Sequence, residues 1–199
     1  KTMIITRTPF RVTLGGGGTD LPSYYSKYGG FILSFTLDKY MYITLKRAFT
    51  DDLIRIKYNK SETVSRLNEI EHDIARECLR KVGLSKGIEV ASMADIPAGT
   101  GLGSSSSYTV GLLSALHSLK RNYYSLQGLA EEACEIEIDV LKKPMGKQDQ
   151  YVAAFGGFLV MDIGQDGLVK VSNAKISVDT LDELKRNLLI FYTGKKRQN

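Results

Sequence analysis

The residues best suited to chemistry form a glycine- and serine-rich segment in the middle of the chain. It reads Pro97-Ala98-Gly99-Thr100-Gly101-Leu102-Gly103 and continues into four serines, Ser104–Ser107. Glycines let backbone amides approach a ligand closely, and the first turn of a helix offers unpaired N–H groups at the positive end of its dipole. The serine hydroxyls add donors to phosphate oxygens, or a neutral ligand for a magnesium ion that phosphates already hold. The segment therefore predicts a phosphate site.

A flexible glycine/serine connection with Ser104 as helix N-cap is the structural alternative. We favour the phosphate site because a linker has no reason to lead directly into the apolar stretch Tyr108–Leu113. The segment is neither a Walker loop nor a dinucleotide fingerprint, since no lysine follows the glycines and their spacing is G-x-G-x-G.

A second candidate is an acidic side chain on an apolar helix face. Over the predicted helix Leu126–Leu141, at about 100° per residue, Leu129, Ala133 and Val140 share one stripe with Glu137. The other acids of this helix lie off the stripe. A buried carboxylate needs a cation or hydrogen-bond donors, so Glu137 requires a partner. The partner could be a metal ion or a lysine. Alternatively, Glu137 lies at the edge of the apolar face, where its carboxylate reaches solvent.

A third candidate is Asp149, which follows Pro144-Met145-Gly146 within Lys147-Gln148-Asp149-Gln150-Tyr151. The proline and glycine predict the start of a short helix, where the dipole keeps a carboxylate ionised. Such a group can accept a hydroxyl proton or orient the hydroxyl as a nucleophile. A stabiliser of the helix start is the alternative.

A fourth candidate lies near the N-terminus, where a strand pattern containing Arg11 leads into Gly15-Gly16-Gly17-Gly18-Thr19-Asp20. The glycine backbone can lie against a ligand, and Thr19 and Asp20 offer acceptors suited to sugar hydroxyls. A tight turn is the alternative for this loop. Arg11 is either a surface residue or a charge aimed at a phosphate site.

The elements that would position these residues follow from periodicity and punctuation. Strands are predicted at Met3–Arg7, Arg11–Leu14, Phe31–Phe35, Tyr40–Arg47, Leu53–Tyr58, Gly87–Ala94, Gly157–Ile163 and Leu188–Thr193. Helices are predicted at Asn68–Val82, Ser104–Leu119 and Leu126–Leu141, with a loop at Asp95–Gly103. Strands first and helices afterwards favour an α+β fold over a doubly wound sheet. The polar stretch Gly164–Gly167 suggests a boundary between a first domain, 1–164, and the beginning of a C-terminal α/β domain, 165–199.

Composition limits the class of protein. The chain has 199 residues, 43% hydrophobic and 25% charged, with a formal charge of +5, which is typical of a folded globular protein. Its basic residues are scattered and predict no nucleic-acid partner. Cys78 and Cys134 are too few for a disulfide framework, and they suit a reducing cytoplasm. No apolar run approaches the roughly 20 residues of a membrane span, and Lys1–Thr8 lacks the features of a targeting segment.

Together these segments resemble the GHMP superfamily of galactokinases, homoserine kinases, mevalonate kinases and phosphomevalonate kinases. The run from Pro97 to Ser107 looks like that family's phosphate-binding motif, and Arg11, nine residues before Asp20, is similar to the sugar-kinase branch. The Gly-Lys-Gln-Asp-Gln stretch resembles the group of D-glycero-D-manno-heptose 7-phosphate kinases. The resemblance covers that family's N-terminal domain and implies its fold, a ribosomal S5 domain 2-like mixed sheet with helices, together with the cofactors ATP and Mg²⁺.

The resemblance also implies roles for matching residues. Asp149 matches the catalytic aspartate, and Arg11 an arginine near the transferred phosphate. Ser105 and Glu137 match the magnesium ligands, and Asp20 a sugar-binding aspartate. The loops complete the implied set, with ATP at Pro97, Gly99, Gly101, Leu102, Gly103, Ser104, Ser105 and Ser106, and sugar at Gly17, Gly18, Thr19 and Asp20. The serine run is longer than the family's usual pair, and Met145 stands where a small residue is more common.

The activity that this resemblance implies is transfer of the γ-phosphate of ATP to the anomeric hydroxyl of a sugar, giving a 1,7-bisphosphate from a heptose 7-phosphate. Two alternatives remain open at this point. One is a kinase of an unphosphorylated sugar such as L-fucose or galactose. The other is a non-catalytic sensor of sugar and ATP with the same fold.

Overall fold

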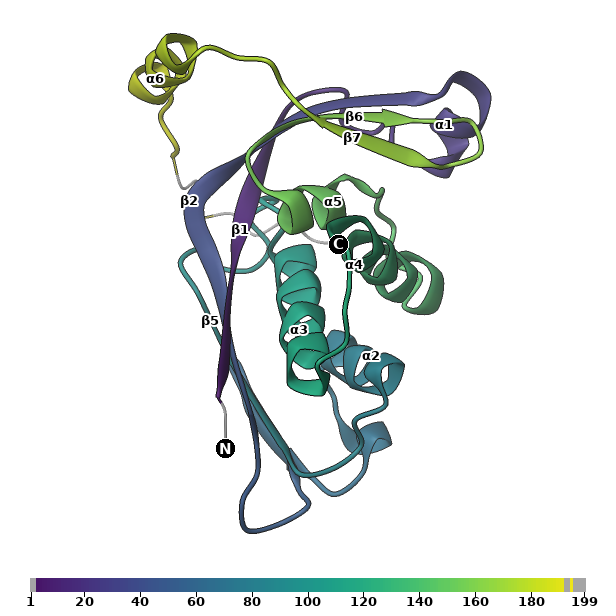
Figure 1. The fold of residues 1–199 in the computed structure, drawn as a ribbon, viewed down its shortest axis with the longest axis vertical. Coiled ribbons are helices and arrows are strands. Elements are labelled where there is room, and N and C mark those ends of the chain that lie inside the picture. The colour runs from purple at the N-terminus through teal and green to yellow at the C-terminus, as the bar shows by residue number, and fades with distance from the viewer. Residues whose placement is uncertain (1–2, 192–193, 195–199) are drawn as a thin grey trace.

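The computed structural model describes residues 3–191 and residue 194. One mixed sheet of seven strands bends over a group of helices, which lie together against one of its faces (Figure 1). The strand order is β4-β3-β5-β2-β6-β7, and β1 pairs with β2 off this path. The strands are β1 Ile4–Gly15, β2 Gly30–Arg47, β3 Ile54–Lys57, β4 Ser61–Val64, β5 Ile88–Ala94, β6 Phe158–Ile163 and β7 Val169–Asn173. The helices are α1 Pro22–Tyr28, α2 Asp73–Val82, α3 Ser104–Lys120, α4 Leu126–Cys134, α5 Gln148–Phe155 and α6 Val178–Asn187, with a 3₁₀ turn at Leu67–Glu69 and a π-helical segment, η2, at Glu135–Val140.

Two long strands form the centre of the sheet. β2 pairs with β6 through its first half and with β5 through its second, and it lies antiparallel to β1 along most of its length. The register of β1 shifts between Pro9 and Arg11. Residues 37–39 of β2 lie opposite Phe10 alone, so the extra residues at this irregularity belong to β2. Phe10 is fully buried at this point, and Arg11 turns toward the start of α3.

The core lies between the sheet and the helices, and α3 is its central member. This helix packs against β1, β2, α2, α4 and α5, so side chains all around it are buried. Val110, Leu112, Leu113 and Leu116 are among them. The prediction of a helix buried on several sides is confirmed, and the α+β fold class is confirmed with it. Within the described residues, no helix is both long and apolar enough to cross a membrane.

Several predicted boundaries are wrong. The separate strands predicted at Met3–Arg7 and Arg11–Leu14 are one strand, whose register with β2 shifts after Pro9. Those predicted at Phe31–Phe35 and Tyr40–Arg47 are one strand that changes partners. The helix predicted at Leu126–Leu141 is α4 followed by η2. For the strand predicted at Leu188–Thr193, residues 188–191 are irregular, and 192–193 lie outside the described residues.

The polar stretch Gly164–Gly167 is the turn of a hairpin. The amide of Gly167 donates to the carbonyl of Gly164 over 2.8 Å, and β6 and β7 pair antiparallel on either side of it. The sheet therefore continues through Asn173 rather than ending at residue 164. The division of the chain into two domains stays a prediction.

Candidate active site

The glycine/serine segment forms a loop whose last residue begins α3. Gly99, Gly101 and Gly103 all have left-handed φ angles, of 81°, 77° and 80°, which glycine adopts without strain. Gly103, not Ser104, is the N-cap, and the first helical bond runs from the Ser107 amide to the Gly103 carbonyl over 2.9 Å. The amides of Ser104, Ser105 and Ser106 precede that bond, so this helix start has the geometry of an anion site.

Strand β1 fixes this loop through Arg11. The Arg11 amide donates to the Leu102 carbonyl over 3.1 Å, and Arg11 Nη1 donates to the Gly101 carbonyl over 2.8 Å. At the loop's far end, the Thr100 hydroxyl donates to the Pro97 carbonyl over 3.2 Å. The loop is therefore held in place by the same strand that carries the candidate arginine.

Arg11 and Asp149 form an ion pair across the start of α3. Arg11 Nε and Nη2 each lie 2.6 Å from Asp149 Oδ1, and the two side chains are 14% and 13% exposed. Because the pair is shielded from solvent, its attraction exceeds that of a surface ion pair. A Cβ atom at Gly103 would lie 3.2 Å from Arg11 Cγ and 3.5 Å from Asp149 Oδ2. The pair thus lies directly beside the N-cap of α3.

Asp149 occupies the first turn of α5, the short helix predicted from the proline and glycine before it. That part of the prediction is confirmed. The carboxylate is bound to Arg11 and points at the helix start of α3, so it does more than stabilise its own helix.

Glu137 is fully buried and lies in η2. Its carboxylate accepts hydrogen bonds from the Ser105 hydroxyl, from the Ser106 hydroxyl over 2.7 Å and from Gln150 Nε2 over 2.7 Å. The apolar stripe correctly identified Glu137 as buried. The same argument placed Val140 on the buried stripe, and this is wrong, because Val140 is exposed. The π-helical turn has more residues per turn than an α-helix, so the phase of the stripe is lost after Glu137.

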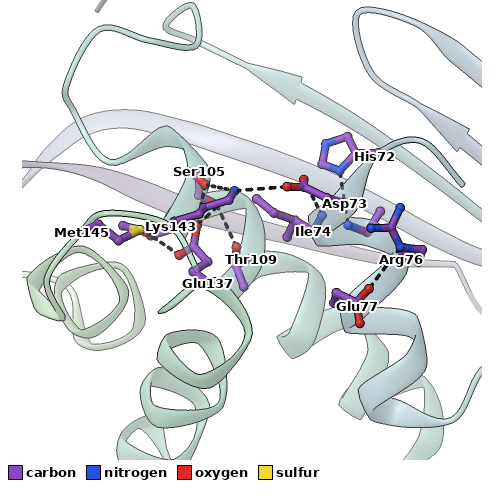
Figure 2. A network of polar contacts seen from close by, with 12 residues as sticks. His72, Asp73, Ile74, Arg76, Glu77, Ser105, Thr109, Glu137, Lys143 and Met145 are labelled. Atoms are coloured by element: carbon purple, nitrogen blue, oxygen red, sulfur yellow. Dashed lines mark hydrogen bonds and ion pairs between the residues drawn. The ribbon is translucent and has the colours of Figure 1, made fainter. Parts of the chain in front are cut away.

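Lys143 is a site residue that the sequence did not reveal. Its ammonium donates to the Ser105 hydroxyl over 3.2 Å and lies 4.0 Å from Glu137 Oε1 and 3.9 Å from Asp73 Oδ2. Figure 2 shows it between Ser105 and Asp73, above Glu137. Lys143 lies in the turn after η2, where no periodic pattern marks its direction.

Gln150 is the second residue that sequence reasoning passed over. It is fully buried, and it joins Glu137 to the helix that carries Asp149. Within the described part of the chain, its Oε1 atom has no hydrogen-bond partner. In the sequence, only its position next to Asp149 in the Gln-Asp-Gln stretch pointed to Gln150. That position does not predict which group its side-chain amide binds.

The residues present fit a magnesium ion. Magnesium prefers oxygen ligands, and it usually takes one or two carboxylates from the protein and the rest from phosphates and water. The Glu137 carboxylate and the Ser105 hydroxyl meet at the helix start where phosphates would bind. Among the described residues, no group of three or more His, Cys, Asp or Glu side chains could hold a metal ion by itself. A bound ion would therefore take its remaining ligands from nucleotide oxygens or from water.

The glycine loop after β1 is an anchored turn. The Thr19 hydroxyl donates to the Gly16 carbonyl over 2.7 Å and accepts from the Phe31 amide over 3.0 Å. Asp20 is 1% exposed and accepts from the Gln148 amide over 3.0 Å. A Cβ atom at Gly146 would lie 2.0 Å from Asp20 Oδ2, so only glycine fits there.

Asp20 is therefore buried within the protein, whereas Thr19 is half-buried and lines a neighbouring cavity. Their predicted role in sugar binding stays a prediction. Asp20 ties the loop to the first residue of α5, next to Asp149, and Gly17 and Gly18 form the bend before it. A hollow of about 550 Å³ lies beside Thr19, between α1 and the β6–β7 hairpin. It includes neither Arg11 nor Asp149. Within the predicted sugar-binding set, Asp20 is joined through the Gln148 amide to the helix that carries Asp149.

Comparison with known proteins identifies the family. The family model described as the GHMP kinases N terminal domain matches residues 51–157. This is more than half of the chain, and the chain belongs to the GHMP kinase family.

The relatives include sugar kinases. The chain is 30% identical to the D-glycero-alpha-D-manno-heptose 7-phosphate kinase of Campylobacter jejuni, over 98% of this chain and 61% of that protein. It is 25% identical to the galactokinase of Pyrococcus furiosus, over 98% of this chain and 54% of that protein. The crystal structure of a D-glycero-D-manno-heptose 1-phosphate kinase from Bacteroides thetaiotaomicron superposes with a TM-score of 0.84 at 32% identity, covering 92% of this chain and 63% of that one. The chain thus spans less than two thirds of each of these relatives.

Proposed function

We propose that this chain carries the nucleotide site of an ATP-dependent sugar kinase, a phosphotransferase of carbohydrate metabolism. It would transfer the γ-phosphate to the anomeric hydroxyl of D-glycero-D-manno-heptose 7-phosphate, giving the 1,7-bisphosphate. The observation that carries the proposal is the shielded Arg11–Asp149 pair beside the open helix start of α3. The buried Glu137 cluster lies on the same helix start and supports it.

Each residue then has a physical task. Amides from Gly101 to Ser106 bind nucleotide phosphates at the positive end of α3. Asp149 orients the attacking hydroxyl or accepts its proton, since a carboxylate held by an arginine stays ionised and fixed. Arg11 offsets negative charge on the transferred phosphate. Asp20 keeps the glycine loop against the start of α5, so Gly17 and Gly18 can lie against the sugar.

Ser105 and Glu137 would hold magnesium. When bound, the ion supplies positive charge to the phosphate oxygens. Glu137 is rigid because three side-chain donors fix its carboxylate. We also propose a cytoplasmic location, which suits the two free thiols, Cys78 and Cys134.

A kinase of an unphosphorylated sugar is the second candidate, favoured by the similarity to a galactokinase. Both candidates would use the same loop, in which Asp20 is buried and bound to the Gln148 amide. A non-catalytic sensor is disfavoured by the intact Arg11–Asp149 pair.

The test is an ADP-release assay on the purified full-length protein with heptose 7-phosphate, the unphosphorylated heptose, galactose and L-fucose. The proposal predicts that heptose 7-phosphate gives the highest kcat/KM. Faster turnover of galactose or L-fucose would favour the second candidate, a kinase of an unphosphorylated sugar. Binding of ATP without ADP release from any sugar would contradict both kinase proposals and favour the sensor.

A further inference from the structure

The cation site at Glu137 already contains a positive charge that belongs to the protein. The Lys143 ammonium lies 4.0 Å from Glu137 Oε1 and donates to the Ser105 hydroxyl over 3.2 Å. These are the two side chains that would hold magnesium under the proposed function. A fully buried carboxylate is costly without a compensating charge, so an ammonium at this position stabilises the protein before any metal binds.

The backbone aims Lys143 at this site. The Lys143 amide donates to the carbonyl of Glu137 itself over 3.0 Å, so the two residues are tied together by main chain as well as by charge. The preceding residue, Lys142, has a left-handed φ of 54°. A non-glycine residue is uncommon in this region and persists only where the surroundings impose it. The turn is therefore built to place Lys143 over Glu137.

The Lys143 ammonium also has a second acidic partner, Asp73, which lies nearer the solvent. Glu137 is 0% exposed, but Lys143 is 26% exposed, and Asp73 is a second acceptor at 3.9 Å with 48% exposure. Asp73 stands in the first turn of α2, on the solvent side of the cluster. Ser105 belongs to the proposed phosphate cradle, so a lysine leaving Glu137 remains within reach of bound phosphates.

We propose that Lys143 is a built-in substitute for the magnesium ion. It neutralises Glu137 in the empty site, gives way when magnesium arrives with the nucleotide, and then binds the nucleotide phosphates. This inference rests on the proposed function for its second half, whereas its first half concerns magnesium alone. A permanent ion pair with no exchange is the competing explanation, and the two differ in their response to magnesium without nucleotide.

The first experiment measures the thermal midpoint with and without Mg²⁺ in the absence of nucleotide. The variant Lys143→Met removes the competing charge, and Lys142→Met, an exposed neighbour, is the matched control for the loss of one positive charge. We expect Mg²⁺ at ten times its dissociation constant to raise the midpoint of Lys143→Met by about 3–6 °C. Wild type and Lys142→Met should rise by less than about 1 °C at the same concentration, because their ammonium still holds the site. The double variant Glu137→Gln, Lys143→Met should lose the response.

The second experiment measures the affinity for a non-hydrolysable ATP analogue with Mg²⁺. Lys143→Met should weaken it at least about tenfold, the usual effect of losing a charged contact, and Lys142→Met should leave it unchanged. If wild type does not bind the analogue at all, the proposed function fails, and the magnesium experiment still decides whether the lysine yields to a cation.

Equal midpoint shifts with Mg²⁺ in wild type and Lys143→Met would overturn the proposal. Should Lys143→Met not fold, Lys143→Gln replaces it, because an amide still donates to Ser105 and Glu137 without competing as a charge. The same magnesium response is expected of that variant. Failure of both variants to fold would also overturn the proposal, since Lys143 would then be a fixed structural partner.

Discussion

Changing Glu137 to Gln tests the metal site with the smallest change in shape. The side chain is fully buried and accepts from Ser105, Ser106 and Gln150, while Lys143 lies 4.0 Å away. Glutamine keeps the volume but replaces one acceptor oxygen with a donor. Its remaining oxygen can still accept from Ser106 and Gln150, and the Ser105 hydroxyl can rotate to accept from the new amide group.

The cost in stability follows from the lost charge. The attraction between Lys143 and Glu137 is about 4 kcal/mol at 4 Å and an effective dielectric constant of about 20. The desolvation of a buried carboxylate opposes most of this attraction, and the partly exposed ammonium can return to water. We therefore expect a net loss of about 1–3 kcal/mol, which lowers the thermal midpoint of a chain this long by about 2–12 °C.

The effect on turnover should be larger than the effect on the fold. If Glu137 is a magnesium ligand, turnover at limiting Mg²⁺ should fall by about 100-fold or more and recover in part at high Mg²⁺. Glu135→Gln is the matched control, because Glu135 lies in the same segment but is exposed and pairs with Lys81 over 2.7 Å. That control should lose less than about 1 kcal/mol and keep its magnesium dependence. A folded Glu137→Gln variant with the magnesium dependence of wild type would refute the metal assignment.

Three further outcomes are expected. Gly103→Ala should weaken binding of an ATP analogue at least about tenfold in a titration, because its Cβ would meet Arg11. The control is Gly156→Ala, which has a φ of 67° and open space around it, so it should lose some stability through backbone strain and keep its affinity for the analogue. Burial lowers the pKa of His72, so the unfolded chain binds its proton first as pH falls below about 6.5. The midpoint should therefore drop from pH 7 toward pH 5, and His72→Asn, which keeps an N-cap acceptor for the Ala75 amide, should flatten that slope. Burial also raises the pKa of the Cys78 and Cys134 thiols, so both should react with a thiol reagent only as fast as the protein opens; rapid labelling at pH 8 would contradict their buried positions.

The sequence predicted an element best where several local signals mark the same position. The α3 helix begins within one residue of its predicted start, since its glycines, serines and apolar run all mark the same place. The short helix with Asp149 in its first turn was likewise predictable from Pro144 and Gly146. Glu137 was found because burying a charge on an apolar stripe needs an explanation.

Prediction failed where distant pairing decides the outcome. The polar residues between Phe35 and Tyr40 read as a break, yet β2 runs through them because its partners change from β6 to β5. The helices α1 and α6 were not predicted, and within the described residues neither has a buried side chain that would leave an apolar period. Strands β4 and β7 were missed because each is short and lies at a sheet edge.

In the site, roles set by side-chain chemistry were easier to predict than roles set by the fold. Thr19 and Asp20 have the chemistry of sugar ligands, and that role stays a prediction, but their use as anchors of the loop was visible only in the fold. Lys143 is one lysine among many in the sequence. Only the π-helical turn and the left-handed residue before it bring its ammonium to Glu137.

The most direct test of the proposed kinase is the turnover of Asp149→Asn, measured beside its sugar and ATP affinities and its thermal midpoint. Asparagine keeps the shape of the side chain, so we expect both affinities to stay within a few fold of wild type, and loss of the ion pair with Arg11 to cost about 1–3 kcal/mol of stability. Turnover should fall by roughly 10²–10⁴-fold, the usual loss when a positioned base is removed. A folded Asp149→Asn protein that transfers phosphate at a near-normal rate would contradict the central claim.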